Sequence, residues 1–300
     1  MATVGKLKIL IDTDLGDDTD DAAALIMALN SPELDIVGIT TVFHNTRKRA
    51  EMVQDLCRFY QREDIPVCPG FKRPLIEDVP YEESPIQYEI LRKDKEFHLY
   101  QEMDAADFLI NAVKNNPDVT IVEMGAMTNL AIAFYRNPEI MENVKIIAMG
   151  GTFTSSFPEW NIKCDPEAAR IVMDKAKHLT MIGLDVTKYC QIPTEFLDEI
   201  CKSDNERMCY YRNGVSLFQK KTNYDVTFHD VLLMVALIKP DIVTFKNSDF
   251  TVELGGSYTR GSIVLKTNGY EMDEKTDRDF QYATRFDRNS FMELLKQRLF

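Results

Sequence analysis

The sequence predicts an α/β protein, a single-domain, open, mostly parallel sheet with helices on both faces. Short runs rich in Ile, Val and Leu are typical of strands that are buried on both faces, as in parallel sheets. These runs alternate with longer segments whose apolar residues recur every three or four positions, the spacing of helices. Because no repeat, low-complexity tract or linker interrupts this alternation, we expect residues 1–300 to form one domain.

The first half of the chain gives the clearest elements. The run Ile9-Leu10-Ile11 predicts a strand, and residues 20–29 predict a helix that Asn30-Ser31-Pro32 ends. Further strands are expected at residues 35–43, 65–68, 120–124 and 144–149. Helical periods span residues 46–61, 104–115 and 128–136.

The second half continues the alternation. Pro166 stands at a favourable early position of a helix over residues 165–177, and a strand is expected at residues 180–184. Beyond Pro193 the pattern is mostly helical, with helices expected at residues 204–219, 230–238 and 288–299. Late strands are expected at residues 242–245, 250–254 and 262–266.

Two long segments lack a regular pattern. Residues 71–98 are charged and contain prolines, and they are too many for a plain connection. We therefore expect a lid, a binding loop or a partner surface there. Residues 150–164 form the second long loop.

The stretch from Lys8 to Leu29 contains the strongest chemical signal. Six aspartates surround Gly16 between the first strand and the first helix, without a Lys or Arg among them: Asp12, Asp14, Asp17, Asp18, Asp20 and Asp21. One or two acids are enough to cap a helix, and six would repel one another unless a cation shared them. A solvated acidic turn is the alternative, but the strand–Gly–helix setting favours a hard divalent cation such as calcium or magnesium.

Composition narrows the partners. The formal net charge of −13 argues against nucleic acid and, more weakly, against a highly phosphorylated substrate, so a neutral small molecule is expected. There is no run of about 18 apolar residues and no signal peptide, which predicts a cytoplasmic protein that does not enter membranes. The six cysteines show no CxxC pairing and are expected to be mostly buried free thiols.

Other polar residues follow the predicted strands. In an open α/β sheet, ligands bind beyond the carboxyl ends of the strands. The residues that fall at such ends are Asp14, Asn45, Glu123, Glu159, Asn161 and Asp185, and His229-Asp230 begins a late helix. Each signal is weak alone, and a lone His is more often structural, but together they predict one site.

These motifs resemble the nucleoside hydrolases of the inosine-uridine preferring type. The stretch DTDLGDDTDDAAAL is similar to the family signature, in a variant with two extra residues before the paired aspartates. Similar matches follow in order at Ile39–Val42 with Asn45, at Met124–Ala131, at Glu159–Ile162 and at Leu184–Thr187, and His229-Asp230 comes last. The likeness covers nearly the whole chain.

The resemblance implies a nucleoside hydrolase-like fold with a Rossmann-like core and a calcium-dependent enzyme. It implies that calcium is held by Asp14, Asp21, Asp230 and the main-chain carbonyl of Met124. It implies that the ribose hydroxyls are held by Asp20, Asn45, Glu159 and Asn161. The expected reaction is hydrolysis of the N-glycosidic bond of a ribonucleoside, through an oxocarbenium-like state that carboxylates stabilise.

In this scheme Asp14 takes the proton of a metal-activated water, and His229 protonates or hydrogen-bonds the departing base. The resemblance also implies a homodimer or homotetramer. Because of the extra residues, the roles of Asp17, Asp18, Asp20 and Asp21 stay open, as does the preference for purine, pyrimidine or modified bases. Phe153 falls near the place where many relatives hold the 5′-hydroxyl with Asn.

Two other functions remain as alternatives. A non-catalytic nucleoside- or ribosyl-binding protein of the same fold would differ only in turnover. A haloacid dehalogenase-type phosphohydrolase also begins with a strand and DxD, here Asp12-Thr13-Asp14, but it needs a Lys near the phosphate that this loop lacks.

Overall fold

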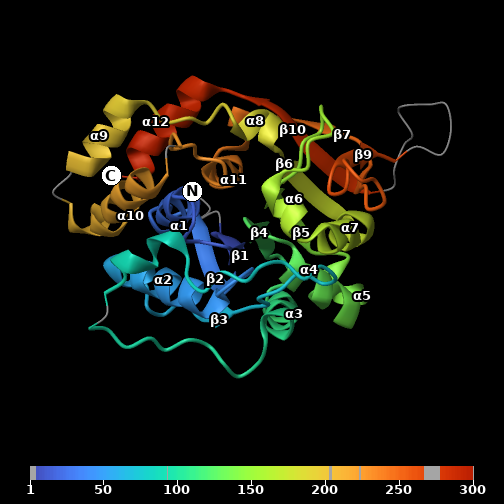
Figure 1. The fold of residues 1–300 in the computed structure, drawn as a ribbon, viewed down its shortest axis with the longest axis horizontal. Helices are drawn as coiled ribbons and strands as arrows, with labels where there is room; N and C mark the ends of the chain where they lie inside the picture. The colour runs from blue at the N-terminus through green and yellow to red at the C-terminus, as the bar shows by residue number, and fades with distance from the viewer. Residues whose placement is uncertain (1–4, 93, 203–204, 223, 267–277, 300) are drawn as a thin grey trace.

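The computed structural model describes residues 5–92, 94–202, 205–222, 224–266 and 278–299. Within them an eight-stranded sheet runs in the order β3-β2-β1-β4-β5-β6-β10-β7 (Figure 1). β7 is antiparallel to β10, and the other neighbouring pairs are parallel. The strands are β1 (Leu7–Thr13), β2 (Leu34–Thr41), β3 (Val67–Pro69), β4 (Thr120–Glu123), β5 (Lys145–Met149), β6 (His178–Ile182), β7 (Val243–Asn247) and β10 (Asp279–Phe286).

The central strand β1 shows why the sheet is covered on both faces. Ile9 and Ile11 belong to one apolar core, and Leu10, which points to the opposite face, belongs to the other. All three side chains are fully buried. An uninterrupted apolar run therefore serves two helical layers at once.

The helices divide between these two cores, and Figure 1 shows the two groups on opposite sides of the sheet. One layer contains α1 (Asp20–Leu29), α2 (Thr46–Phe59), α9 (Thr194–Lys202), α10 (Cys209–Lys221), α11 (Val231–Ile238) and α12 (Arg288–Arg298). The other contains α3 (Ala105–Asn115), α4 (Thr128–Arg136), α5 (Pro138–Met141) and α7 (Pro166–Lys175). The predicted open, mostly parallel sheet with helices on both faces is confirmed.

Several boundaries differ from the sequence prediction. The strand β10 was not predicted, although it lies inside the sheet between β6 and β7. The strands expected near residues 250 and 263 are β8 (Phe250–Val252) and β9 (Ile263–Leu265), which form a separate antiparallel pair. The long loop after β5 contains a short helix, α6 (Trp160–Cys164), and a one-turn helix, α8 (Leu184–Thr187), follows β6.

Short 3-10 helices account for further differences. The helix expected to begin at residue 204 is instead η2 (Glu206–Met208) followed by α10, and η3 (Pro240–Ile242) precedes β7. The 71–98 segment is irregular where it is described, except for η1 (Ile86–Ile90).

The described cysteines are mostly buried free thiols, as the sequence predicts. Four free thiols are buried, those of Cys57, Cys68, Cys164 and Cys190, and Cys209 is half-buried. The side chain of Cys201 lies outside the described residues. Within the described ranges, none of the helices combines the length and the apolar character needed to cross a membrane.

Gly38 of β2 allows the closest contact between the sheet and α3. A Cβ atom at this position would lie 2.6 Å from Cζ of Phe108 and 3.2 Å from Cδ1 of Leu10.

We therefore expect Gly38→Ala to lower the free energy of unfolding by about 1–3 kcal/mol, because overpacking displaces the ring. Urea titration measures this change. Gly5→Ala, where a Cβ meets nothing within 4 Å, should have little effect. The double variant Gly38→Ala/Phe108→Leu should recover part of the loss, and equal stability of Gly38→Ala and the wild type would contradict this packing.

Candidate active site

The site lies at the topological switch point of the sheet, where the order of the strands reverses along the chain. The chain proceeds from β1 to β2 and β3 on one side, and then returns to place β4 on the other side of β1. Such a switch point opens a crevice at the carboxyl ends of the two adjacent strands. Asp12 of β1 is in register with Glu123 of β4, so residues 13–16 and 124–126 leave the sheet side by side.

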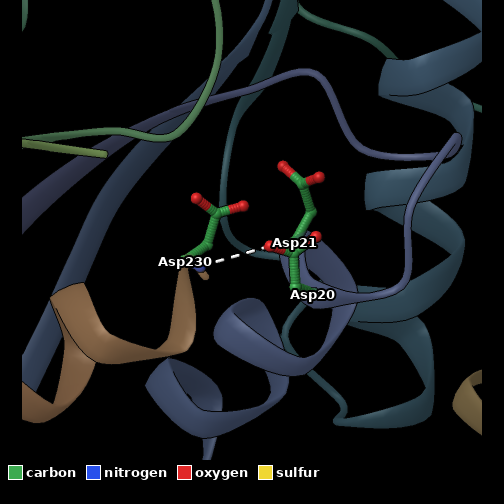
Figure 2. A group of neighbouring side chains, drawn as sticks. All are labelled: Asp20, Asp21 and Asp230. Carbon is green, nitrogen blue, oxygen red and sulfur yellow. Dashed lines mark hydrogen bonds between the residues drawn. The ribbon is translucent and has the colours of Figure 1, made fainter. Parts of the chain in front are cut away.

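Three aspartates converge beside this crevice. One carboxylate oxygen from each of Asp20, Asp21 and Asp230 lies within 4.8 Å of the others. Figure 2 shows Asp20 and Asp21 at the start of α1 and Asp230 just before α11. The backbone N–H of Asp230 donates to Oδ2 of Asp20 at 3.2 Å, the dashed line in Figure 2. Residues 210 positions apart are thus joined directly.

Burial makes this cluster costly to ionise. It raises the pKa of Asp21 and Asp230 well above the usual range, and the neighbouring carboxylates raise it further. Burial likewise raises the pKa of Asp14 to about 7, opposed by the charge of Arg49, and that of Asp20 to about 6. Among the described residues, Oδ1 of Asp230 is buried and has no hydrogen-bond partner. Crowded, desolvated oxygens with an unsatisfied acceptor are the donor set that suits a hard divalent cation.

Asp14 belongs to the same electrostatic group. Its charge raises the pKa of Asp20, Asp21 and Asp230, and it follows β1 directly. Thr13 orients the cluster from the strand side, because its Oγ1 donates to Oδ1 of Asp21. Gly125 allows the close approach of β4, since a Cβ there would lie 3.2 Å from Cβ of Asp14.

Asp12 has a different role. It is fully buried, and its carboxylate accepts hydrogen bonds from Thr40 Oγ1 at 2.8 Å and from Asn129 Nδ2 at 2.8 and 3.0 Å. These bonds join β1, β2 and α4 beneath the site. A phosphohydrolase of the haloacid dehalogenase type would use this residue as an exposed nucleophile, so the structure argues against that alternative.

Glu159 and Asn161 lie at the ends of β4 and β5 on the short helix α6. Glu159 caps α6: its carboxylate accepts from the N–H groups of Asn161 at 3.0 Å, Ile162 at 3.3 Å and Gly151 at 2.9 Å. The Asn161 amide donates to the carbonyls of Met124 at 3.0 Å and Met149 at 3.2 Å. Both side chains are buried, and Asn161 directly contacts the carbonyl expected to bind calcium.

Asn45 follows β2, but its described contacts are structural. Its Oδ1 accepts from the N–H of Lys48 at 3.2 Å, which caps α2, and its Nδ2 donates to the carbonyl of Glu83 at 2.9 Å. The two preceding residues, Phe43 and His44, have positive φ angles of 66° and 55°. Non-glycine residues adopt this backbone only where the surroundings enforce it, as functional sites often do.

His229 stands beside Asp230 and faces the aspartate loop. Its Nδ1 lies 2.9 Å from Oγ1 of Thr187 on α8. Burial lowers the pKa of His229, and the charge of Asp18 opposes that shift. Burial also raises the pKa of Asp18 to about 7, with Asp20 adding to the rise.

The four aspartates with open roles therefore have different surroundings. Asp17 pairs with Arg49 at 2.7 Å, and Asp18 faces His229. Asp20 and Asp21 lie with Asp230. The group includes Asp20, which was expected to bind ribose, and does not include Asp14, which was expected to bind the ion, so the individual roles of these residues stay predictions.

Asp185 and Phe153, two further residues named from the sequence, are bonded to each other. Asp185 accepts from the N–H of Phe153 and, at 2.5 Å, from Oγ1 of Thr154, so it anchors the loop after β5. The ring of Phe153 packs against Phe250 and Tyr282, with centroids 5.0 Å away in both cases.

Sequence reasoning missed Arg49, Thr13 and Thr187. Arg49 had a detectable signal, because it falls on the same helical face as Ala50 and Val53 and is therefore a cation at a core-facing position. Thr13 and Thr187 stand inside matched motifs, but their roles were not predicted, since a hydroxyl beside a site cannot be distinguished from any other Thr without the fold.

Comparisons with known proteins identify the family of the chain. The family model for the inosine-uridine preferring nucleoside hydrolases matches residues 9–293. The chain is 33% identical to "Uridine nucleosidase 1" of Arabidopsis thaliana over 271 residues, covering 83% of this chain and 79% of that protein. It is 31% identical over 285 residues to "Non-specific ribonucleoside hydrolase RihC" of Salmonella paratyphi B, covering 88% and 89%.

A solved structure described as "Plant nucleoside hydrolase - PpNRh1 enzyme" has a TM-score of 0.84 and 28% identity and covers 98% of both chains. The family match over nearly the whole chain, together with these relatives, extends the agreement from the motifs to the complete fold. The chain belongs to the inosine-uridine preferring nucleoside hydrolase family and is a hydrolase of N-glycosyl compounds.

Proposed function

We propose that this protein hydrolyses the N-glycosidic bond of neutral ribonucleosides, releasing ribose and a free base, with calcium as its resident cofactor. The observation that carries the proposal is the convergence of Asp20, Asp21 and Asp230 beside Asp14, with Oδ1 of Asp230 buried and unsatisfied. Family membership supports the reaction class, and the two relatives named above act on uridine or ribonucleosides by their names.

The donor set fits calcium. Asp14, Asp21, Asp230 and the carbonyl of Met124 would hold the ion, and they supply hard oxygen ligands only. The Met124 carbonyl already accepts one bond from Asn161, and a carbonyl oxygen has two lone pairs. Bound calcium would orient a water and lower the pKa of that water.

The protein's own groups account for the remaining steps. Asp14 accepts the proton of the attacking water, because its carboxylate directly follows β1 beside the carboxylates of the cluster. Asp20, Asn45, Glu159 and Asn161 bind the ribose hydroxyls. The buried carboxylates stabilise the positive charge that develops on the sugar without reorganising. His229 donates a proton or a hydrogen bond to the departing base.

The setting of the enzyme belongs to the same proposal. Residues 1–300 act as one catalytic domain, in a homodimer or homotetramer in the cytoplasm.

The substrate panel is the direct test. We expect inosine and uridine to be hydrolysed, whereas 2′-deoxyuridine and uridine monophosphate should react at least about 100-fold less efficiently in kcat/KM. A missing 2′-hydroxyl leaves buried hydrogen-bonding groups unpaired, and a 5′-phosphate approaches a loop rich in carboxylates. A reducing-sugar assay in one buffer measures all four. Equal turnover of the deoxynucleoside or the monophosphate would refute this pocket, and binding without ribose release would favour a non-catalytic binder.

Removal of calcium should weaken both stability and turnover. Without the ion, the buried carboxylates repel one another, and an ion that binds only the folded state raises its stability. We expect calcium at 100 times its Kd to stabilise the chelator-stripped protein by about 2.7 kcal/mol. Thermal unfolding and uridine hydrolysis, each followed as calcium is restored, measure the two effects. If exhaustive chelation changes neither, the cation site is wrong.

His229→Ala should affect natural nucleosides more than activated substrates. We expect kcat for uridine to fall by about 10²–10⁴-fold, the range for loss of a general acid. A nitrophenyl riboside, whose leaving group departs without protonation, should lose far less. Thr187→Val, which removes the contact to Nδ1, should show a milder form of the same pattern. Equal losses on both substrates would show that His229 does not assist leaving-group departure.

A further inference from the structure

The guanidinium of Arg49 lies directly behind the aspartate loop. It comes from the first turn of α2, and its side chain is only 1% exposed. Nε donates to the carbonyl of Phe43 at 2.9 Å, and Nη1 donates to the carbonyls of Asp14 and, at 3.1 Å, Leu15. Nη2 donates to Oδ2 of Asp17 at 2.7 Å.

These bonds join two loops that carry expected site residues. Asp14 and Leu15 directly follow β1, and Phe43 lies two residues before Asn45 in the loop after β2. One planar cation therefore sets the distance between the two chain segments at the carboxyl ends of β1 and β2. Arginine suits this position because its rigid fork carries five donors, whereas lysine offers a point charge.

Both carboxylate oxygens of Asp17 accept a bond in the same arrangement. Its Oδ2 receives Arg49, and its Oδ1 receives the N–H of Ile86 at 3.0 Å. The next residue, Gln87, is buried and donates its backbone N–H to the carbonyl of Gly16 at 2.8 Å. Asp17 therefore acts as the counter-ion of Arg49 and fastens the 83–89 segment to the aspartate loop.

We propose that Arg49 is a positioning residue that holds Asp14 in place for the cation and the attacking water, with Asp17 as its counter-ion and not a ligand of the ion. This inference rests on the proposed function, in which Asp14 is both a ligand and the general base. Fixing the Asp14 carbonyl restricts the backbone that carries its carboxylate, and a misplacement of about 1 Å at a reacting group can cost about 100-fold in rate.

Arg49→Lys tests the role of the fork while keeping the charge. We expect calcium to bind about 10–100-fold more weakly, as is typical when a group that orients a metal ligand is lost, and kcat for uridine to fall by a similar factor. Calorimetric calcium titration of the chelator-stripped protein and steady-state kinetics measure the two effects, at a temperature where circular dichroism shows each variant folded.

Arg92→Lys is the matched control. Arg92 also pairs with a buried aspartate of α2, since its Nε donates to Oδ1 of Asp55 at 2.8 Å, but it does not contact the aspartate loop. If Arg49 were merely structural, both variants would lower the melting temperature and leave calcium affinity unchanged. We expect Arg92→Lys alone to behave in that way.

Asp17→Asn tests whether Asp17 is a counter-ion of Arg49 or a ligand of calcium. It also replaces Arg49→Lys as the test if that variant does not fold. It removes the ion pair and keeps the three carbonyl bonds of Arg49, so calcium affinity should fall by less than about tenfold. Asp21→Asn should weaken binding far more. Loss of calcium binding in Asp17→Asn as complete as in Asp21→Asn would overturn the assignment of Asp17.

The outcomes also distinguish this inference from the proposed function. A wild-type protein that binds calcium and releases ribose, together with an Arg49→Lys variant equal to it in calcium affinity and kcat, overturns the inference alone. A wild-type protein that neither binds calcium nor releases ribose overturns both.

Discussion

The burial of several carboxylates at the carboxyl end of β1 is the constraint on which the site depends. The charge of Asp14 raises the pKa values of Asp20, Asp21 and Asp230, and burial adds the larger share of each shift. A folded protein tolerates such crowding only if protons, fixed cations or a bound ion neutralise it. The free energy that packs β1 between two apolar layers keeps these acids together before any ligand arrives. The packing that stabilises the sheet therefore holds together carboxylates that repel one another.

The surrounding elements restrict the carboxylates without neutralising them all. Thr13 donates to Asp21, the N–H of Asp230 donates to Asp20, and Glu159 accepts three backbone N–H groups. Each bond removes rotational freedom and still leaves acceptor capacity, because an ionised carboxylate has about four lone-pair positions. Helix capping and ligand binding can therefore use the same side chain. The positions of the carboxylates are set before a ligand binds, which lowers the reorganisation needed when positive charge develops on the sugar.

The sequence predicted the sheet, most helices and the residues of the cluster, and the limits of that prediction have physical causes. Continuous apolar runs reveal strands buried on both faces, but β10 mixes Asp279, Arg285 and polar residues with its apolar ones, which hid a strand inside the sheet. The helix α6 is only five residues long, too short for a helical period. The nearness of Asp230 to Asp20 depends on the packing of α11 against α1, and no local pattern expresses it.

Arg49 shows why a charged residue at a core-facing helical position can indicate a functional role. A buried guanidinium is stable only when its donors are satisfied, and here three of its four acceptors are main-chain carbonyls. The guanidinium holds these carbonyls in place, but carbonyl groups carry no net charge and do not neutralise it. Part of its positive potential therefore still acts on the neighbouring carboxylates. The same cation then reduces the repulsion among them in the absence of a bound ion and preserves the backbone geometry that a bound ion requires. Because that geometry involves the loops after β1 and β2 together, a change at Arg49 acts on both sides of the crevice at once.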